Sequence, residues 1–413
     1  MITRRNFRKA ERGQVLILCA IFMIVLLLFV GLAVDFGMAY VTKAQLGKAV
    51  DAAALTGARY SAQGTVKGTA LAQSAFAMNY GTSSLDYTAP PVVNVNYSTD
   101  AGGNTLVNVS ATATNKTFFA GLLPGFSTLN VASTAQSKAA RVQMTLVLDR
   151  TGSMAASGDG GILAIPGAVS DFITMFDDTN DSAALVSFAD DVTVNVPMRT
   201  GSFQQAIINA ADALTANGPT WSEGALQQAL TTETTFSPPP GTNPQRVVVF
   251  FTDGLANTIK STATCTSGSQ KSGTWNMGGQ DNNTGYSLFH AGNNNAVCSN
   301  SGCCAGTFTS LAGTQEKINW QDISAPLTGD ASVRAIALAN TMRADNITVY
   351  AIGLGDGNAG TVEPFLCQIA NDPCSLTYNA NAPQGVMEWA PNAEALDQAF
   401  QTIATIIRLK LTQ

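Results

Sequence analysis

Oxygen-bearing side chains gather directly after a short apolar run in the first half of the chain. Met144-Thr-Leu-Val-Leu-Asp149 is typical of a buried parallel strand, which forms a continuous apolar run. Thr151 and Ser153 follow Asp149 at two-residue spacing. One carboxylate and two hydroxyls on one loop form an all-oxygen cluster, the ligand chemistry that Mg²⁺ or Mn²⁺ prefers. Because ligands bind outside the carboxyl ends of strands in open α/β sheets, we expect a cation site here.

Two later segments carry further oxygen-bearing side chains. Arg246-Val-Val-Val-Phe-Phe-Thr-Asp-Gly254 is a second strand-like run, and Asn217-Gly-Pro-Thr-Trp-Ser-Glu-Gly224 is a turn before a helical pattern. With the first segment they resemble the von Willebrand factor A domain and its metal-ion-dependent adhesion site. That family uses an Asp-x-Ser-x-Ser loop, and threonine in place of its first serine keeps the hydroxyl. The resemblance implies one divalent cation, Mg²⁺ or Mn²⁺ with Ca²⁺ as an alternative, held by Asp149, Thr151, Ser153, Thr220 and Asp253.

Each segment also has an ordinary structural explanation. Asp-Gly after a strand is a common turn signal, and Ser or Thr after a strand often caps the next helix. It is the combination of the three segments, in order and with an α/β pattern between them, that favours the metal site.

Composition narrows the classes of function. The 413 residues carry a net charge of -6 and only 12% charged residues, whereas strong nucleic-acid binding normally needs a basic surface. The one histidine, His290, has no second histidine with which to form a zinc site or a catalytic dyad. A metal-dependent hydrolase would need a general base or nucleophile near the carboxylates, and no further carboxylate cluster lies near these motifs.

The amino terminus predicts a membrane anchor. Residues 1–14 form a basic tail, and the uncharged apolar run from Val15 to Val34 is long enough to cross a bilayer. By the positive-inside rule the tail stays cytoplasmic and the rest of the chain is extracytoplasmic, as in a single-pass protein of the inner membrane. Two alternatives involve processing. Gly31-Leu-Ala33 resembles a weak signal-peptidase site, and Gly13 resembles a prepilin cleavage site, although Leu18 stands where pilins usually carry glutamate.

Cysteine usage agrees with an oxidising compartment. An even number of cysteines outside the membrane run suggests a disulfide framework rather than a zinc site, since the spacings do not form paired C-x₂-C knuckles. Cys367 and Cys374 are close enough in sequence for a local bridge. The remaining pairing is open among Cys265, Cys298, Cys303 and Cys304.

The pattern along the chain predicts three extracytoplasmic parts. Residues 35–85 form a helical segment with a small apolar face, which packs on its own domain or on a partner helix. The members of that face are Leu46, Val50, Ala53, Ala54 and Gly57. Residues 86–140 form a small β-rich module, with a hairpin at 92–97 and 106–114, a short helix or loop at 118–126 and a strand at 129–137.

Residues 141–413 alternate strands and helices, as in a Rossmann-like, doubly wound α/β fold with a mainly parallel sheet. The predicted strands are 142–148, 183–188, 192–196, 246–252 and 347–354. The predicted helices are 162–176, 203–214, 222–230, 331–343 and 393–407. The strand order 3-2-1-4-5-6 makes strands one and four neighbours, which brings Asp149 and Asp253 together. An irregular, cysteine-containing insertion at about 258–325 lies on the same face.

The arrangement resembles TadG-like proteins of the Tad (Flp) pilus assembly system. The matching segments are Glu11-Arg-Gly-Gln14, Val34-Asp-Phe-Gly37 and Val50-Asp-Ala-Ala-Ala-Leu55, followed by the A domain. The family implies a bacterial envelope protein that acts in pilus assembly or surface adhesion. Since protein oxygens fill only part of an octahedral Mg²⁺ shell, an acidic side chain of a partner protein would complete it. A structural envelope protein without a working metal site is the alternative.

Overall fold

The protein is described by a computed structural model that covers two compact units. Unit 1 comprises Met1–Ser98, Leu106–Lys138 and Leu411–Gln413, and unit 2 comprises Thr99–Thr105 and Ala139–Lys410. The described residues are 12–81, 90–122, 124–156, 161–264, 270–279, 287–290, 307–317, 329–355 and 359–408. Most of the basic tail and four cysteines of the insertion, Cys265, Cys298, Cys303 and Cys304, lie outside them.

A single long helix begins unit 1. Helix α1 (Arg12–Arg59) is 48 residues long, and the apolar side chains from Val15 to Val34 are almost all exposed. The stretch is long and apolar enough to cross a membrane, with a mean hydropathy of 3.3 over 18 residues. Such a surface is stable only where lipid or protein covers it.

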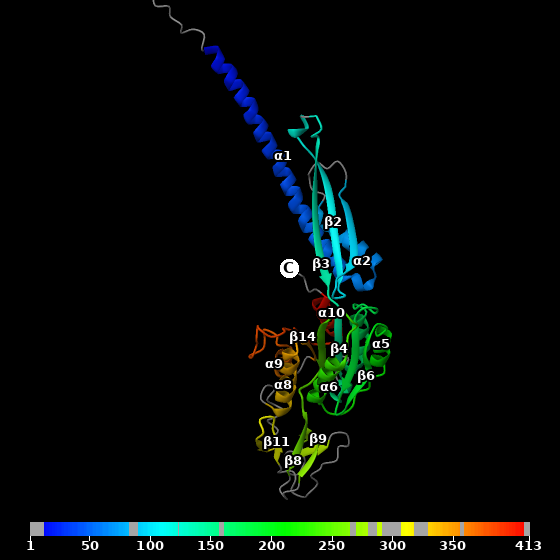
Figure 1. The fold of residues 1–413 in the computed structure, drawn as a ribbon. Helices are drawn as coiled ribbons and strands as arrows, with labels where there is room; N and C mark the ends of the chain where they lie inside the picture. Colours follow the sequence, from blue (N-terminus) through cyan, green and yellow to red (C-terminus); the bar gives the residue numbers. More distant parts are fainter. Residues whose placement is uncertain are drawn as a thin grey trace, which may run out of the picture. The chain divides into compact units, whose positions relative to one another are not determined.

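The second half of α1 packs within unit 1, beside α2 (Thr65–Tyr80) and a three-stranded antiparallel sheet (Figure 1). The strands follow in the order β1 (Val92–Thr99), β2 (Thr105–Lys116) and β3 (Thr128–Ala139). A Cβ on Gly57 would lie 2.8 Å from Val107, so the small residue allows the helix to approach the sheet closely. The predicted helix face is thus buried on its own domain.

Unit 2 contains a six-stranded sheet with the order β14-β13-β7-β4-β5-β6. Its strands are β4 (Val142–Asp149), β5 (Ser182–Phe188), β6 (Val192–Thr200), β7 (Gln245–Thr252), β13 (Thr348–Leu354) and β14 (Met387–Ala390). Only β6 is antiparallel to its neighbour. Numbered within the domain, this is the predicted order 3-2-1-4-5-6. It places β4 directly beside β7.

Helices cover both faces of the sheet. One core cluster joins the sheet to α4 (Gly161–Ile173), α5 (Gln204–Asp212) and α10 (Ala393–Arg408). The other joins it to α6 (Ser222–Thr235), α8 (Asp330–Ala344) and α9 (Ala359–Ala370). Sequence patterns did not predict α9 or β14, because α9 contains Pro364 and β14 has only four residues. The disulfide between Cys367 and Cys374 joins α9 to the following loop, which confirms the local bridge.

The insertion after β7 was predicted to be irregular, and this prediction is wrong for its described residues. Its described residues form a second sheet of order β10-β9-β8-β11-β12 (Figure 1). The strands are β8 (Thr258–Thr264), β9 (Gln270–Gly279), β10 (Ser287–His290), β11 (Thr307–Thr309) and β12 (Gln315–Lys317). Ile259, Trp275 and Phe308 are buried in the second core cluster. The polar composition concealed these strands, since these three buried side chains are spread over about fifty residues and give no period-two signal.

Candidate metal centre

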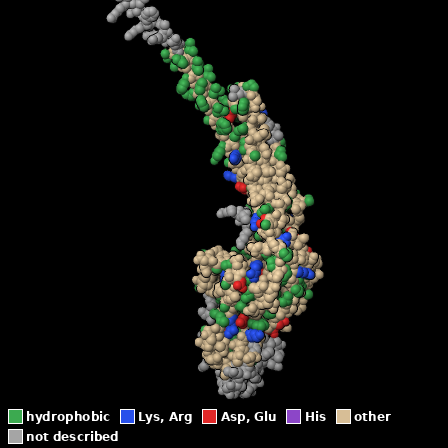
Figure 2. All heavy atoms as spheres, in the orientation of Figure 1, with side chains coloured by type: hydrophobic (Ala, Val, Ile, Leu, Met, Phe, Trp, Pro, Cys, Tyr) green, Lys and Arg blue, Asp and Glu red, His purple; other side chains and the backbone are tan. Residues whose placement is uncertain are grey.

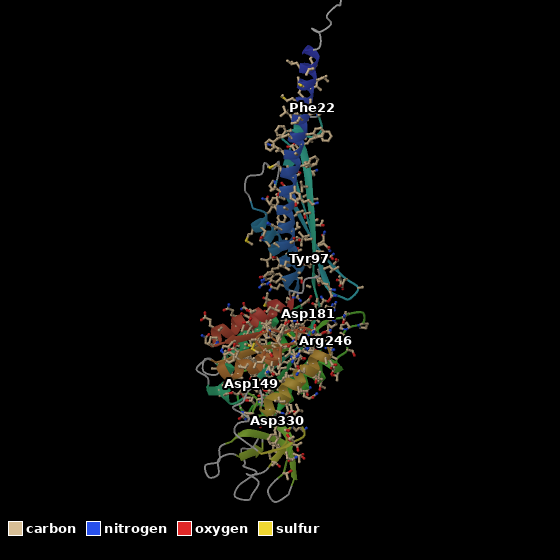
Figure 3. All side chains as sticks on the ribbon, turned by 90° about the vertical axis from the view of Figure 1, so that its left-hand side faces the viewer. Phe22, Tyr97, Asp149, Asp181, Arg246 and Asp330 are labelled. Carbon is tan, nitrogen blue, oxygen red and sulfur yellow. A yellow bond between two sulfur atoms is a disulfide. The ribbon has the colours of Figure 1, made fainter. Side chains whose placement is uncertain are left out.

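Asp149 ends β4 and is fully buried. Its Oδ1 accepts the backbone N–H of Thr151 at 2.7 Å, and its Oδ2 accepts the hydroxyl of Thr252, the last residue of β7. The parallel pairing of β4 with β7 places Thr252 there. Two donors from two strand ends therefore fix the orientation of the Asp149 carboxylate. Asp149 is labelled in Figure 3.

A chain of hydroxyls joins the loop after β4 to the loop after β7. The hydroxyl oxygens of Thr151 and Ser153 lie 2.9 Å apart, and the Ser153 hydroxyl donates to Oδ1 of Asp253 at 2.7 Å. Thr151 and Asp253 are buried, whereas Ser153 is exposed. The cluster is thus enclosed on the side of the sheet and open at Ser153.

The loop that carries Thr220 is bonded to both of these loops. Gly218 accepts the N–H of Gly152 on its carbonyl at 2.8 Å. Thr220 accepts the N–H groups of Asn257 and Thr258 on its carbonyl, at 3.0 and 3.2 Å, and donates its own N–H to the Asn257 side chain at 2.7 Å. These contacts bring the third predicted segment to the same edge of the sheet.

The structure thus brings the five predicted residues to one region in two ways. Asp149, Thr151, Ser153 and Asp253 are connected by side-chain and backbone hydrogen bonds. Thr220 is connected to the loop after β7 by hydrogen bonds of its backbone.

Two residues that the sequence analysis missed, Thr252 and Asn257, orient members of this set. Thr252 could have been found from its place directly before Asp253, because the last residue of one strand faces the end of the parallel strand beside it. Asn257 gives no such signal.

Electrostatics indicate what the site could hold. Burial, and then the negative charge of Asp253, raise the pKa of Asp149 to about 7. Two carboxylates so close in a buried setting repel each other unless a proton or a cation lies between them. Among the described residues no three His, Cys, Asp or Glu side chains gather in one place, so a metal site here depends on hydroxyl ligands. Carboxylates with hydroxyls are a hard oxygen set, which fits Mg²⁺ or Mn²⁺.

Comparison with known families covers both units. Residues 13–60 match the family model described as putative Flp pilus-assembly TadE/G-like. Residues 144–255 match the von Willebrand factor type A domain. No curated protein matches the chain.

Several solved structures are similar at low identity. The von Willebrand factor domain of the type V pili tip protein Mfa5 from Porphyromonas gingivalis is 15% identical with a TM-score of 0.43, covering 67% of this chain and 97% of that one. The PilB minor pilin from Streptococcus sanguinis is 15% identical with a TM-score of 0.43, covering 78% and 79%.

Proximal thread matrix protein 1 from the mussel byssus, with a zinc-occupied MIDAS motif, is 16% identical with a TM-score of 0.38, covering 66% and 47%. The present chain therefore spans less than half of that protein, and it spans 36% of the pilus adhesin SpaC from Lactobacillus rhamnosus GG.

The family matches agree with the fold and with the order of the two units along the chain. In this chain a TadE/G-like amino-terminal region precedes a von Willebrand factor type A domain, an arrangement consistent with a TadG-like protein.

Proposed function

We propose that this protein is anchored in the inner membrane and uses a divalent cation on its A domain to recognise a partner protein, in Tad/Flp pilus assembly or surface adhesion. The observation that carries the proposal is the continuous set of oxygens from Asp149 through Thr151 and Ser153 to Asp253, which is buried at Asp149, Thr151 and Asp253 and exposed at Ser153. Pilus-related proteins with these domains are typically non-enzymatic.

The chain's own residues divide the work of such a site. Thr252 and the Thr151 N–H hold the Asp149 carboxylate in one orientation, and Ser153 sits at the open side. Asp149, Thr151, Ser153, Thr220 and Asp253 would hold the cation, Mg²⁺ or Mn²⁺ with Ca²⁺ as an alternative. A bound cation supplies a Lewis-acidic position that an acidic side chain of the partner can occupy in place of water.

The location follows from α1. The exposed apolar run from Val15 to Val34, with a basic tail before it, supports a single crossing with the amino terminus in the cytoplasm. Both the small sheet of unit 1 and the A domain then lie on the extracytoplasmic side, where the Cys367–Cys374 disulfide is stable.

Calorimetric titration of the detergent-solubilised full chain with Mg²⁺ and Mn²⁺ tests the metal site. We expect binding by the wild type and by Asp212→Asn, which removes an exposed acid elsewhere in unit 2, and at least a tenfold weaker affinity in Asp253→Asn. Equal binding by all three proteins, or by none, would favour the structural alternative.

The recognition step needs a second experiment. Purified pili of the encoding bacterium are immobilised, and retention of the full chain is measured in Mg²⁺ and in chelator. Retention that needs both the cation and Asp253 supports the proposal, and retention that is indifferent to both contradicts it. Turnover of generic phosphate esters or peptides that depends on metal would instead indicate a hydrolase, and we expect none.

A further inference from the structure

The loop between β2 and β3 presents apolar side chains to the surroundings. Phe118 is 56% exposed, Leu122 77% and Phe126 61%. No charged residue occurs between Lys116 and Lys138. Figure 2 shows hydrophobic side chains along the first part of α1 and at the adjoining end of this hairpin. Scattered exposed apolar residues are normal, but a cluster of this size with no charge usually marks a contact surface.

The loop is fixed beside α1 at the end of the apolar run. The Phe119 ring lies against Gly31, where an added Cβ would come within 2.5 Å of it. One helical turn later, Asp35 accepts three backbone N–H groups of the loop: Phe118 at 2.8 Å, Phe119 at 3.0 Å and Ala120 at 2.7 Å. The loop therefore lies level with the last turns of the predicted membrane span.

The first part of the loop backbone is also hydrogen-bonded within the protein. Thr117 donates its N–H to the Ser127 carbonyl at 3.2 Å and its hydroxyl to the Phe126 carbonyl, and the Leu122 N–H reaches the Phe119 carbonyl at 3.2 Å. Because lipid offers no hydrogen bonds, backbone groups near the hydrocarbon must be satisfied internally. The three hydrogen bonds to Asp35 satisfy backbone N–H groups of the loop. They also stabilise the negative charge of the Asp35 carboxylate.

We propose that the apolar side chains of the loop between β2 and β3, on residues 118–122 and 126, insert into the extracytoplasmic leaflet of the membrane that α1 crosses, as a second lipid contact of unit 1. The inference rests on the proposed membrane anchor. Lipid is the expected occupant because the apolar surface of the loop is continuous with that of α1, at the same level. One helix alone can rotate and tilt in a bilayer. A second contact fixes the orientation of unit 1 on the membrane.

Depth-dependent fluorescence quenching tests this insertion. The full chain is reconstituted in phosphatidylcholine and phosphatidylglycerol vesicles that carry nitroxide groups at a shallow or a deep position. An NBD label is placed on native Cys19, in the predicted span, or on a cysteine introduced into Cys19→Ser at Leu122, at Phe126 or at Thr134, an exposed position within β3. Cys19→Ser without an added cysteine is the labelling blank.

We expect the labels at 122 and 126 to be quenched at least about twofold more than the label at 134, and most by shallow nitroxides, as for an interfacial segment. The label on Cys19 should respond most to deep nitroxides. If Cys19 is quenched but 122 and 126 behave like 134, the loop insertion is wrong and the anchor stands. If Cys19 is not quenched either, both fail. If the label at 122 is not quenched by nitroxide lipids and its fluorescence changes as the protein-to-lipid ratio rises, a second copy of the chain covers the loop and the proposal is overturned.

Discussion

At the scale of single residues, two buried acidic side chains lie in different environments along β4. Asp149 at its end faces the candidate cation site, whereas Glu233 on α6 packs against the middle of the strand. Glu233 accepts the Thr145 hydroxyl at 2.7 Å and the Gln143 amide at 2.9 Å. Burial nevertheless raises the pKa of Glu233 to about 8. This glutamate therefore takes up a proton on folding over much of the physiological pH range.

Glu233→Gln should remove a pH dependence of stability. Because the folded-state pKa of about 8 exceeds the ordinary value of 4.5, the stabilisation is complete below 4.5 and is lost as pH rises towards 8. We expect the wild type to lose on the order of 2 to 4 kcal/mol relative to Glu233→Gln between about pH 5 and 8, measured by urea unfolding. Glu394→Gln, at an exposed position of α10, should behave like the wild type. Parallel pH profiles for the two variants would contradict the assignment.

Gly218 is a second position where one residue type decides the local structure. It has a φ of +82°, and an added Cβ would overlap the Asp190 carboxylate. Gly218→Ala should therefore displace the carbonyl that accepts the Gly152 N–H and weaken Mg²⁺ binding several-fold in calorimetry. Gly241→Ala is the matched control, since its φ is +79° with open space around it, and it should cost only about 1 to 2 kcal/mol of backbone strain. Unchanged metal affinity in Gly218→Ala would show that the loop tolerates the shift.

At the scale of elements, α10 is fixed in two ways: its apolar face packs in the core, and its carboxyl end forms an ion pair. Phe400, Ile403 and Ile407 are buried in the first core cluster. At the carboxyl end, Nη1 of Arg408 lies 3.1 Å from Oδ2 of Asp181, and both side chains are buried. Burial raises the pKa of Asp181, and the charge of Arg408 opposes that rise. Asp181 directly precedes β5, whereas Asp149 ends the parallel strand β4. The end of α10 is thus bonded at the amino ends of the strands, away from the cation site at their carboxyl ends, and Figure 3 labels both residues.

Arg408→Ala should destabilise unit 2 strongly. The substitution leaves Asp181 buried without its cation, and breaking a buried pair in this way typically costs about 3 to 5 kcal/mol. Urea unfolding of the full chain gives the value. Arg199→Ala removes an exposed arginine of β6 and should change the free energy of unfolding by less than about 0.5 kcal/mol. Similar losses in the two variants would mean that the pair adds nothing beyond general charge.

At the scale of the whole molecule, the two units have separate cores. In unit 1 helix and sheet bury residues such as Leu46, Phe76 and Val107, while unit 2 has its two clusters on either face of the six-stranded sheet. Units with their own cores commonly unfold separately. The candidate cation site belongs entirely to unit 2.

Calorimetry of the reconstituted chain should show two unfolding transitions. Mg²⁺ should raise only the transition of unit 2, because a ligand that binds the native state adds about 2.7 kcal/mol at 100 times its dissociation constant. In Asp253→Asn the temperatures of both transitions should be unchanged by Mg²⁺. A single transition that moves as a whole with Mg²⁺ would show that the units unfold cooperatively.

Much of the fold could be predicted because its signals are local. The apolar run 15–34, the alternation in β2 and the continuous apolar strands β4 and β7 each reveal their environment within a few residues. The strand order follows from the general winding of such sheets, and the observed order agrees with it. Short or interrupted elements such as β14, α9 and the insertion strands did not give such signals.

The sequence by itself determined which residues are available for chemistry: an acid after each of two buried strands, hydroxyls at fixed spacing and an apolar amino-terminal helix. Tertiary structure alone decided how they are held. Thr252 reaches Asp149 across 103 positions of sequence, Asn257 reaches Thr220 across 37, and Asp35 reaches the β2–β3 loop across 83 to 85. The physical reason is that a residue's type and its neighbours in sequence set its local preference, whereas these partners meet only when separate strands, helices and loops pack together.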